Sequence, residues 1–390
     1  MSEAIVNDDV DMDGLDAAED GSGESLLVKP WDPKKIRITT KSFTLREIVD
    51  QIKDGDIDLS PDFQREYVWK SRQRTRLIES VLLGIPLPAF YFNQSETGVY
   101  QVVDGVQRLS TINLYMNDGF ELSGSDLEYL SELKGLSFGK LDQVLVRRFK
   151  SAQIVVHIIE PQTPDEVKYD IFNRVNTLGS PLSAQEIRHA MSGMRSRSFL
   201  MELAEDNSFD QATENQYWRR SDGGGAVRDS RRMANRELAL RFCAFRSCSI
   251  DEYRQFSSLD SFLMDFTKRI DGTSESTKIS DDQLGALKDE FTNAMKAAFE
   301  ILGEFAFRRI QPDSERRGPI NRAVFEAQAN ALADHPVELL RKHKKVVQEA
   351  LRLVFDDPEY TRSVTVSTGS ASRVAYRLEQ TKRALTEALP

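Results

Sequence analysis

The hydrophobic pattern of the chain changes near Pro164, and this change limits the fold more than any other feature. Before it, β-branched runs such as Gln153–Ile159 alternate with segments whose apolar residues recur at helical spacing. After it, helical spacing dominates to residue 390. We therefore predict an α+β domain at 31–195, with a mixed sheet and helices, followed by an all-helical domain at 196–390.

Local signals place the elements of the first domain. Thr44 and Glu47 form a capping-box pattern for a helix that ends at Gly55, and a second helix begins near Ser71 and ends at Gly84. Expected strands are 36–40, 89–93, 99–103 and 153–159, with a helix at 106–117 and two short helices within 125–149. The later expected helices are 164–176, 183–193, 196–206, 230–246, 258–270, 281–307, 321–333, 336–355 and 371–388.

Residues 1–30 differ in charge from the rest of the chain. They carry nine acidic residues and one basic residue, with almost no periodic apolar pattern, so we predict a disordered acidic tail. The whole chain has 62 acidic and 52 basic residues, and the part after the tail is therefore nearly neutral. The net charge of −10 is thus no argument against a nucleic-acid partner.

Composition excludes several classes of protein. Two cysteines, Cys243 and Cys248, cannot build a disulfide framework or a zinc site on their own. The longest apolar run, Val81–Phe92, is short and broken by glycine and proline, so we expect no membrane span. The acidic start is unlike a signal or transit peptide. We expect a cytoplasmic protein.

The segment Val102–Thr111 predicts a strand, a tight Asp104-Gly105 turn and the start of a helix. Helix N-termini expose unpaired N–H groups and suit phosphates. Gly105 would let a ligand approach the backbone, and Arg108 would offer a guanidinium to phosphate oxygens. Gln107 would orient water or a base edge, and Asp104 would hold a divalent cation. The alternative is that Asp104 only caps the helix and Arg108 is a surface residue.

Two further polar segments accompany this turn. Phe63–Trp69 places Gln64 and Arg65 among aromatic residues, a combination that can stack on a base and pair with phosphate. The segment 170–183 carries Asn173, Arg174 and Asn176 at a helix end. The alternatives are a packed loop for the first, and a helix C-cap joined to a capping box for the second.

Together these segments resemble the N-terminal domain family of GmrSD-type restriction endonucleases, within the ParB/sulfiredoxin-like superfamily. The family patterns F-Q-R-x-x-V-W, I-P-x-P-x-x-Y, D-G-Q-Q-R-L-T-T-I and I-F-x-R-x-N-x-x-G-x-P-L-x-x-x-E-I-R correspond to segments starting at Phe63, Ile85, Asp104 and Ile171. Val106 replaces the first Gln of D-G-Q-Q-R, which bears on hydrolysis more than on binding. In the second half, Pro319–Phe325 and Ser367–Gly369 also look like family members.

The resemblance implies a ParB-like nucleotide-binding fold and a role in DNA restriction or anti-phage defence. It implies nucleoside-triphosphate hydrolysis with Mg²⁺, with Asp104, Gln107 and Arg108 as catalytic residues and Asp104 as metal ligand. The nucleotide-binding set is then Gln64, Arg65, Gly105, Arg108, Ser110, Thr111, Asn173, Arg174 and Asn176. Two alternatives stay open: a nucleotide-gated switch without turnover, and a ParB-like nuclease.

An arginine-rich stretch at 217–246 favours a DNA partner. The stretch contains eight arginines and only three acidic residues, and it begins with the aromatic residues Tyr217 and Trp218. We predict nucleic-acid contacts by Arg219, Arg220, Arg231, Arg232 and Arg236. A solvated face, or pairing with acids elsewhere in the chain, is the alternative.

Known nuclease signatures are not visible in the sequence. A histidine-based metal site needs paired histidines in a hairpin and helix, and His157, His189, His335 and His343 do not form that pattern. We therefore expect cleavage to require a nuclease or effector subunit as partner, and self-association is left open.

Overall fold

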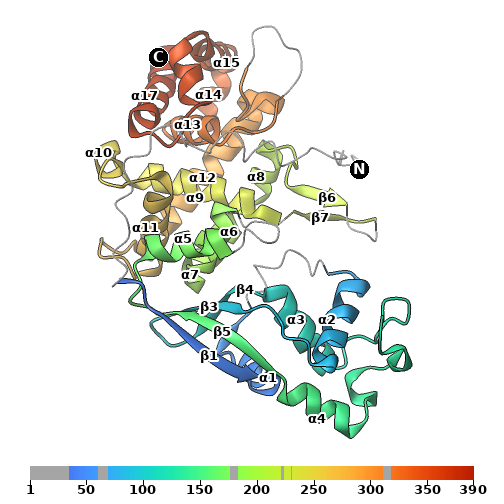
Figure 1. The fold of residues 1–390 in the computed structure, drawn as a ribbon. Helices are drawn as coiled ribbons and strands as arrows, with labels where there is room; N and C mark the ends of the chain where they lie inside the picture. The colour runs from blue at the N-terminus through green and yellow to red at the C-terminus, as the bar shows by residue number, and fades with distance from the viewer. Residues whose placement is uncertain (1–34, 60–68, 176–182, 221–223, 230, 311–317) are drawn as a thin grey trace. The chain divides into compact units, whose positions relative to one another are not determined.

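The computed structural model describes residues 35–59, 69–175, 183–220, 224–229, 231–310 and 318–390 (Figure 1). Contacts divide this part of the chain into two units, one within 29–191 and one within 192–390. Each unit is described by itself. The predicted acidic tail lies outside the described residues, and no described helix has the length and apolarity to cross a membrane.

The first unit is built on a five-stranded mixed sheet of order β1-β5-β3-β4-β2. These strands are β1 (Ile38–Thr44), β2 (Ile57–Asp58), β3 (Phe90–Gln94), β4 (Tyr100–Asp104) and β5 (Gln153–Ile159). β1 pairs with β5 and β3 with β4 in antiparallel fashion, whereas β5–β3 and β4–β2 are parallel. The predicted α+β class is confirmed.

Helices cover this sheet and create two cores. Ile154, Val156 and Ile158 of β5 belong to the larger core, which also contains residues of the first four helices. On the other face Ile159 packs with Phe172 in a smaller core. The helices are α1 (Leu45–Asp54), α2 (Ser71–Leu83), α3 (Val106–Met116), α4 (Gln143–Ser151), α5 (Asp165–Val175) and α6 (Ala184–Ala190).

Capping groups fix the ends of α1 and α2 where the sequence indicated. The Glu47 amide donates to Thr44 Oγ1 at 3.2 Å, and the Thr44 amide donates to Glu47 Oε2 at 2.7 Å. The Glu47 carboxyl has a lowered pKa, because the Thr44 amide and hydroxyl donate to its charged form. Gly55 and Gly84 end the two helices in the left-handed conformation.

The second unit is helical, as predicted, and also contains one hairpin. Its helices are α7 (Met194–Ala204), α8 (Asn207–Ala212), α9 (Ala234–Ser247), α10 (Ile250–Tyr253), α11 (Leu259–Asp271), α12 (Asp281–Leu302), α13 (Arg322–Ala333), α14 (Val337–Lys342), α15 (Lys344–Leu353), α16 (Pro358–Ser363) and α17 (Ala371–Ala388). The hairpin joins β6 (Trp218–Arg220) to β7 (Ala226–Arg228). The sequence patterns missed this hairpin and the short helices α8, α10 and α16.

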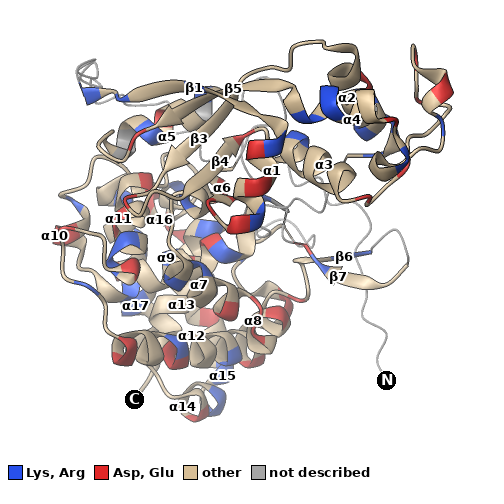
Figure 2. Cartoon of the chain, turned by 90° about the horizontal axis from the view of Figure 1, so that it is seen from below, with Lys and Arg blue, Asp and Glu red and all other residues tan. Residues whose placement is uncertain are grey.

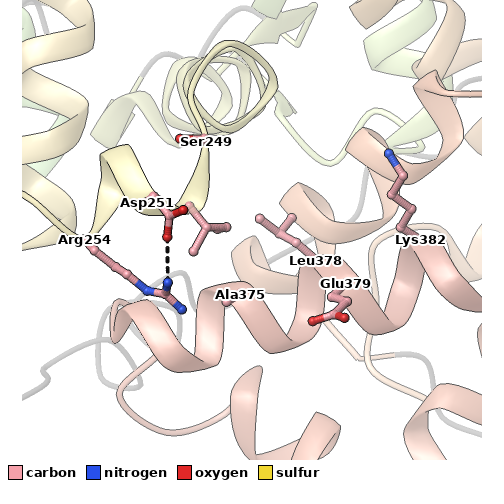
Figure 3. Close-up of a pocket in the computed structure, with 8 residues that line it drawn as sticks. Ser249, Asp251, Arg254, Ala375, Leu378, Glu379 and Lys382 are labelled. Atoms are coloured by element: carbon pink, nitrogen blue, oxygen red, sulfur yellow. Dashed lines mark hydrogen bonds and ion pairs between the residues drawn. The ribbon is translucent and has the colours of Figure 1, made fainter.

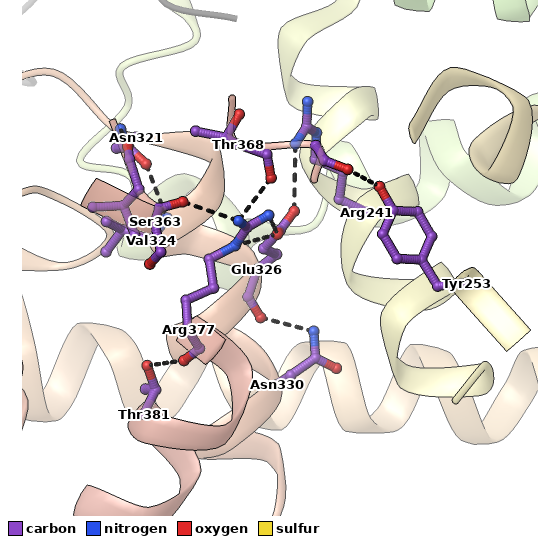
Figure 4. A network of polar contacts seen from close by, with 12 residues as sticks. Arg241, Tyr253, Asn321, Val324, Glu326, Asn330, Ser363, Thr368, Arg377 and Thr381 are labelled. Atoms are coloured by element: carbon purple, nitrogen blue, oxygen red, sulfur yellow. Dashed lines mark hydrogen bonds and ion pairs between the residues drawn. The ribbon is translucent and has the colours of Figure 1, made fainter. Parts of the chain in front are cut away.

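A buried ion-pair network joins α9, α13 and α17 (Figure 4). Glu326 is fully buried and accepts from Arg377 Nε at 2.7 Å and from Arg241 Nη1 at 3.3 Å. Arg377 also donates to the carbonyls of Ser363 and Thr368. Arg241 donates in addition from Nε and Nη2 to Glu237 Oε1 at 2.9 and 2.8 Å. The Glu326 carboxylate therefore holds two guanidinium groups within the core.

Removing the central charge of this network should be costly. We expect Glu326→Gln to lower the free energy of unfolding by about 3–5 kcal/mol, because it leaves buried guanidinium charge without its partner. The matched control is Glu349→Gln in an exposed pair with Arg352, for which we expect a loss below about 1 kcal/mol. Urea unfolding measures both, and equal losses would contradict the central role of Glu326.

Candidate functional site

The turn after β4 requires glycine at position 105. Gly105 is the N-cap residue of α3 and has φ +101°, a left-handed conformation that side chains disfavour. A Cβ atom there would lie 2.2 Å from Cδ1 of Phe90. Asp104 therefore does not cap α3, which corrects the capping alternative for this residue. No side chain bonds the N-terminal amides of α3 in the part of the chain that the structure describes.

A register shift places Asp104 at the end of the strand pair. Phe92 pairs with Val102, whereas Tyr91 pairs with Asp104, so β4 contains one extra residue at this point. Such bulges redirect a side chain and end the regular ladder. Asp104 thus lies at the end of β4, next to the first turn of α3, which contains Arg108.

Arg108 connects the residues before β3, the end of β4 and the first turn of α3. Its Nη2 donates to Asp104 Oδ2 at 2.9 Å and to the Ala89 carbonyl at 3.3 Å, and its Nη1 donates to the Pro88 carbonyl. The guanidinium carbon lies 4.2 Å from the centre of the Phe90 ring. Burial lowers the pKa of Arg108, and the Asp104 charge partly offsets that effect. Arg108 is therefore not a plain surface residue.

The ion pair leaves part of Arg108 available. A guanidinium carries five N–H donors, and the three bonds above use one Nη1 and both Nη2 hydrogens. The Asp104 side chain is 34% exposed, against 13% for Arg108. A ligand at the turn would thus meet Asp104 first and would compete with it for Arg108.

Two polar atoms one turn apart on α3 lack partners. Gln107 Oε1 and Ser110 Oγ are buried and accept or donate no hydrogen bond within the described chain. Buried polar atoms are normally paired, so both are candidates for ligand contact. Thr111 differs, because its side chain is buried and its hydroxyl donates to the Gln107 carbonyl at 2.7 Å.

The other predicted nucleotide contacts are placed only in part. Gln64, Arg65 and Asn176 lie outside the described residues. Asn173 and Arg174 lie on α5, and Arg174 is exposed in its last turn. The neighbouring Phe172 packs in one core with Val103 and Ile159, which anchors α5 to the same sheet as the turn.

The described acidic residues near the turn do not form a cluster that would hold a metal ion without a ligand. Within the described ranges, no group of three or more His, Cys, Asp or Glu side chains could hold a metal ion. Asp104 alone fits a different case, since Mg²⁺ at phosphate sites commonly takes one or two carboxylates plus phosphate oxygens. The predicted metal role of Asp104 thus depends on a nucleotide.

Several arginines of the 217–246 stretch are engaged within the second unit. Arg228 pairs with Asp210 at 2.7 Å and lies over the Trp218 ring. Arg246 pairs with Glu290 and Asp334. The intramolecular alternative therefore holds for these two and for Arg241.

The five predicted DNA contacts differ in access. Arg236 is only 5% exposed, which argues against a direct phosphate contact. Arg232 is partly buried with φ +63°, and the Arg231 side chain is not described. Arg220 is exposed on β6, and Arg219 beside it lies 3.9 Å from Asp229. Figure 2 shows basic residues on both hairpin strands.

The buried carboxylate of Glu79 was not predicted from the sequence. Glu79 on α2 accepts from the backbone amides of Glu128, Tyr129 and Leu130 at 2.7–3.1 Å. It orders the connection between α3 and α4. The one sequence feature that could have indicated this role is the position of Glu79, an acidic residue on an otherwise apolar face of the helix.

A hollow in the second unit is unrelated to the predicted residues. It has a volume of about 430 Å³ and lies between α10 and α17 (Figure 3). Ala375 and Leu378 line it, together with an Asp251–Arg254 ion pair of 2.7 Å. These charged groups pair with each other, so the hollow does not indicate a ligand class.

The conformation of Gly105 yields a stability prediction. We expect Gly105→Ala to destabilise the fold by about 1–2 kcal/mol through its backbone conformation and by about 1–3 kcal/mol more through the clash with Phe90. Gly98→Ala is the control, because Gly98 has φ +91° and an added Cβ atom would have no neighbour within 4 Å. Urea unfolding of both variants separates the two costs, and identical losses would show that Phe90 moves freely.

Comparisons with known proteins bear on the sequence motifs. Among solved structures, the chain matches a Pnob8-like ParB-N domain at 11% identity, with 91% of this chain and 99% of that chain covered and a TM-score of 0.23. A search of curated proteins finds no match. The family model of the GmrSD restriction endonuclease N-terminal domain matches residues 45–192.

Proposed function

We propose that the chain acts in restriction of foreign DNA or anti-phage defence and that its 45–192 domain binds a nucleoside triphosphate with Mg²⁺ at the β4–α3 turn. The family match supports the restriction role. The observation that carries the binding site is the open N-terminus of α3, where Gly105 supplies no side-chain cap.

The chemistry of this turn suits an anion. The first turn of α3 contains no acidic residue, and its free amides lie at the positive end of the helix dipole. Phosphate oxygens would accept from these amides and from the remaining donors of Arg108. The Ser110 hydroxyl would donate to a phosphate oxygen, whereas Gln107 Oε1 can only accept and would take a hydrogen bond from water.

The remaining roles follow the predicted set. Asp104 would offer one oxygen ligand to the Mg²⁺ that accompanies a triphosphate, and Gln107 would orient the attacking water. Thr111 supports the helix beneath these groups. Contacts by Gln64, Arg65, Asn173, Arg174 and Asn176 stay part of the proposal.

One observation favours a switch as second candidate function. Asp104 and Arg108 already neutralise each other, so nucleotide binding would exchange one Arg108 partner for another. An exchange between two discrete pairings gives a two-state element that a ligand can bias. Binding would then alter the corner between β3, β4 and α3 even without turnover.

Substitutions at the ion pair test nucleotide binding. We expect Arg108→Ala to weaken triphosphate binding by at least about tenfold, because a phosphate loses a charge-assisted bond. Asp104→Asn should strengthen phosphate binding in the absence of Mg²⁺, because it removes the charge that competes for Arg108, and it should remove most of the Mg²⁺ dependence. Arg147→Ala, an exposed arginine on α4, is the matched control. Calorimetric titration with ATP, GTP, CTP and UTP, with and without Mg²⁺, decides, and wild-type protein that binds none of them defeats the proposal.

Product analysis separates the three activities. Released phosphate indicates a hydrolase, and binding without product indicates a switch. A metal-dependent activity that nicks plasmid DNA would indicate the nuclease alternative, provided that this activity copurifies with the chain.

The hairpin gives a prediction for DNA. We expect Arg219→Gln with Arg220→Gln to weaken DNA binding and to reduce its salt dependence by about one unit for each phosphate contact that the substitutions remove. Arg236→Gln serves as a contrast, because a buried arginine should lower stability before it changes the salt slope. Fluorescence anisotropy over a salt series measures the slope, and an unchanged slope in the double variant removes the hairpin from the DNA surface.

A further inference from the structure

One family-like motif residue, Tyr91, has no role in the function proposed above. Tyr91 lies in β3 between Phe90 and Phe92, which both face the larger core. Because side chains alternate along a strand, Tyr91 faces the opposite side of the sheet. Its side chain is partly buried against the smaller core and has no hydrogen-bond partner among the described residues.

Register places Tyr91 between two other polar groups. It pairs with Asp104 of β4 on one side and with His157 of β5 on the other. His157 pairs in turn with Thr40 of β1. Figure 1 shows these strands side by side in this order. A row across four strands therefore begins at the proposed phosphate site and ends at the edge strand.

Two aromatic rings form the middle of this row. The rings of Tyr91 and His157 lie 4.9 Å apart between centroids and are tilted by 46°. Thr40 Oγ1 lies 2.9 Å from His157 Nδ1, which fixes the imidazole in place. His157 is only partly buried, and Val155 on the same face of β5 is 42% exposed. The rings are thus held in position, and both stay partly exposed beside the smaller core.

We propose that Tyr91 and His157 form the platform on which the base of the bound nucleotide stacks, an inference that rests on the proposed nucleotide function. Neighbouring strands are about 5 Å apart, so the platform lies one to two strands, or about 5–10 Å, from Asp104. This separation suits a nucleoside triphosphate whose phosphates reach the α3 N-terminus. Aromatic stacking accepts every base, so it supplies affinity rather than base choice.

If the platform binds the base and the turn binds the phosphates, ligands with and without a base should respond differently to substitutions. Inorganic tripolyphosphate has the phosphates of the nucleotide and no base. We expect Tyr91→Leu to weaken binding of ATP, GTP, CTP and UTP by about tenfold and to leave tripolyphosphate binding unchanged. Tyr91→Phe keeps the ring and should bind nucleotide like the wild type. Arg108→Ala should weaken both ligands.

Further variants guard against loss of the fold. His157→Ala tests the second ring without touching the smaller core, and Tyr129→Leu alters a tyrosine of the same unit that is 68% exposed. Melting curves accompany each titration. Nucleotide binding that is unaffected by both Tyr91→Leu and His157→Ala overturns the platform while leaving the phosphate site intact. Failure of wild-type protein to bind any nucleotide or tripolyphosphate overturns the proposed function and the platform together.

Discussion

The contact between Arg108 and Asp104 holds the candidate site together. One guanidinium joins the start of β3, through the carbonyls of Pro88 and Ala89, to the end of β4 and the first turn of α3. Gly105 makes this arrangement possible, because only a residue without a side chain fits beside the Phe90 ring that Arg108 covers. The conformation at the N-terminal end of α3 is therefore set by an ion pair and a glycine rather than by a capping side chain. A nucleotide would meet an assembled corner with unused donors.

The pair between Asp104 and Arg108 limits which anions could use the proposed site. The Asp104 side chain is 34% exposed, so solvent screens the pair, but a phosphate that takes its place must still replace the bond that Asp104 gives up. A single phosphate contact would only exchange one charged partner of Arg108 for another. Several phosphate oxygens, the α3 amides and a cation that occupies Asp104 would together give a net gain. The proposed site would thus favour a triphosphate with Mg²⁺ over a simple phosphate, and it would link nucleotide binding to a change in the Asp104–Arg108 pair.

Features that depend on near neighbours in the sequence were predictable. The Thr44 and Glu47 capping box, the helix ends at Gly55 and Gly84 and the limits of β5 agree with the structure because each depends on a few adjacent residues. The turn at Gly105 was also predicted from its Asp-Gly signal. The partner of Asp104 was not, because the β-bulge that redirects it comes from pairing with β3. The row through Tyr91 and His157 was invisible for the same reason, since it depends on the order of strands in the sheet.

The arginine-rich stretch shows the same limit in the second unit. Arg228, Arg246 and Arg241 pair with Asp210, Glu290 and Glu326, which lie 18, 44 and 85 residues away in the sequence. A local count of charge cannot detect such partners, so it overstates the basic surface. Arginines that hold helices together have already exchanged water for carboxylates, and a DNA phosphate would have to displace those carboxylates at the cost of a buried pair. The proposed binding of DNA by this unit would therefore depend on the arginines that stay accessible, of which Arg220 on the hairpin is one, and on a correspondingly modest release of counterions.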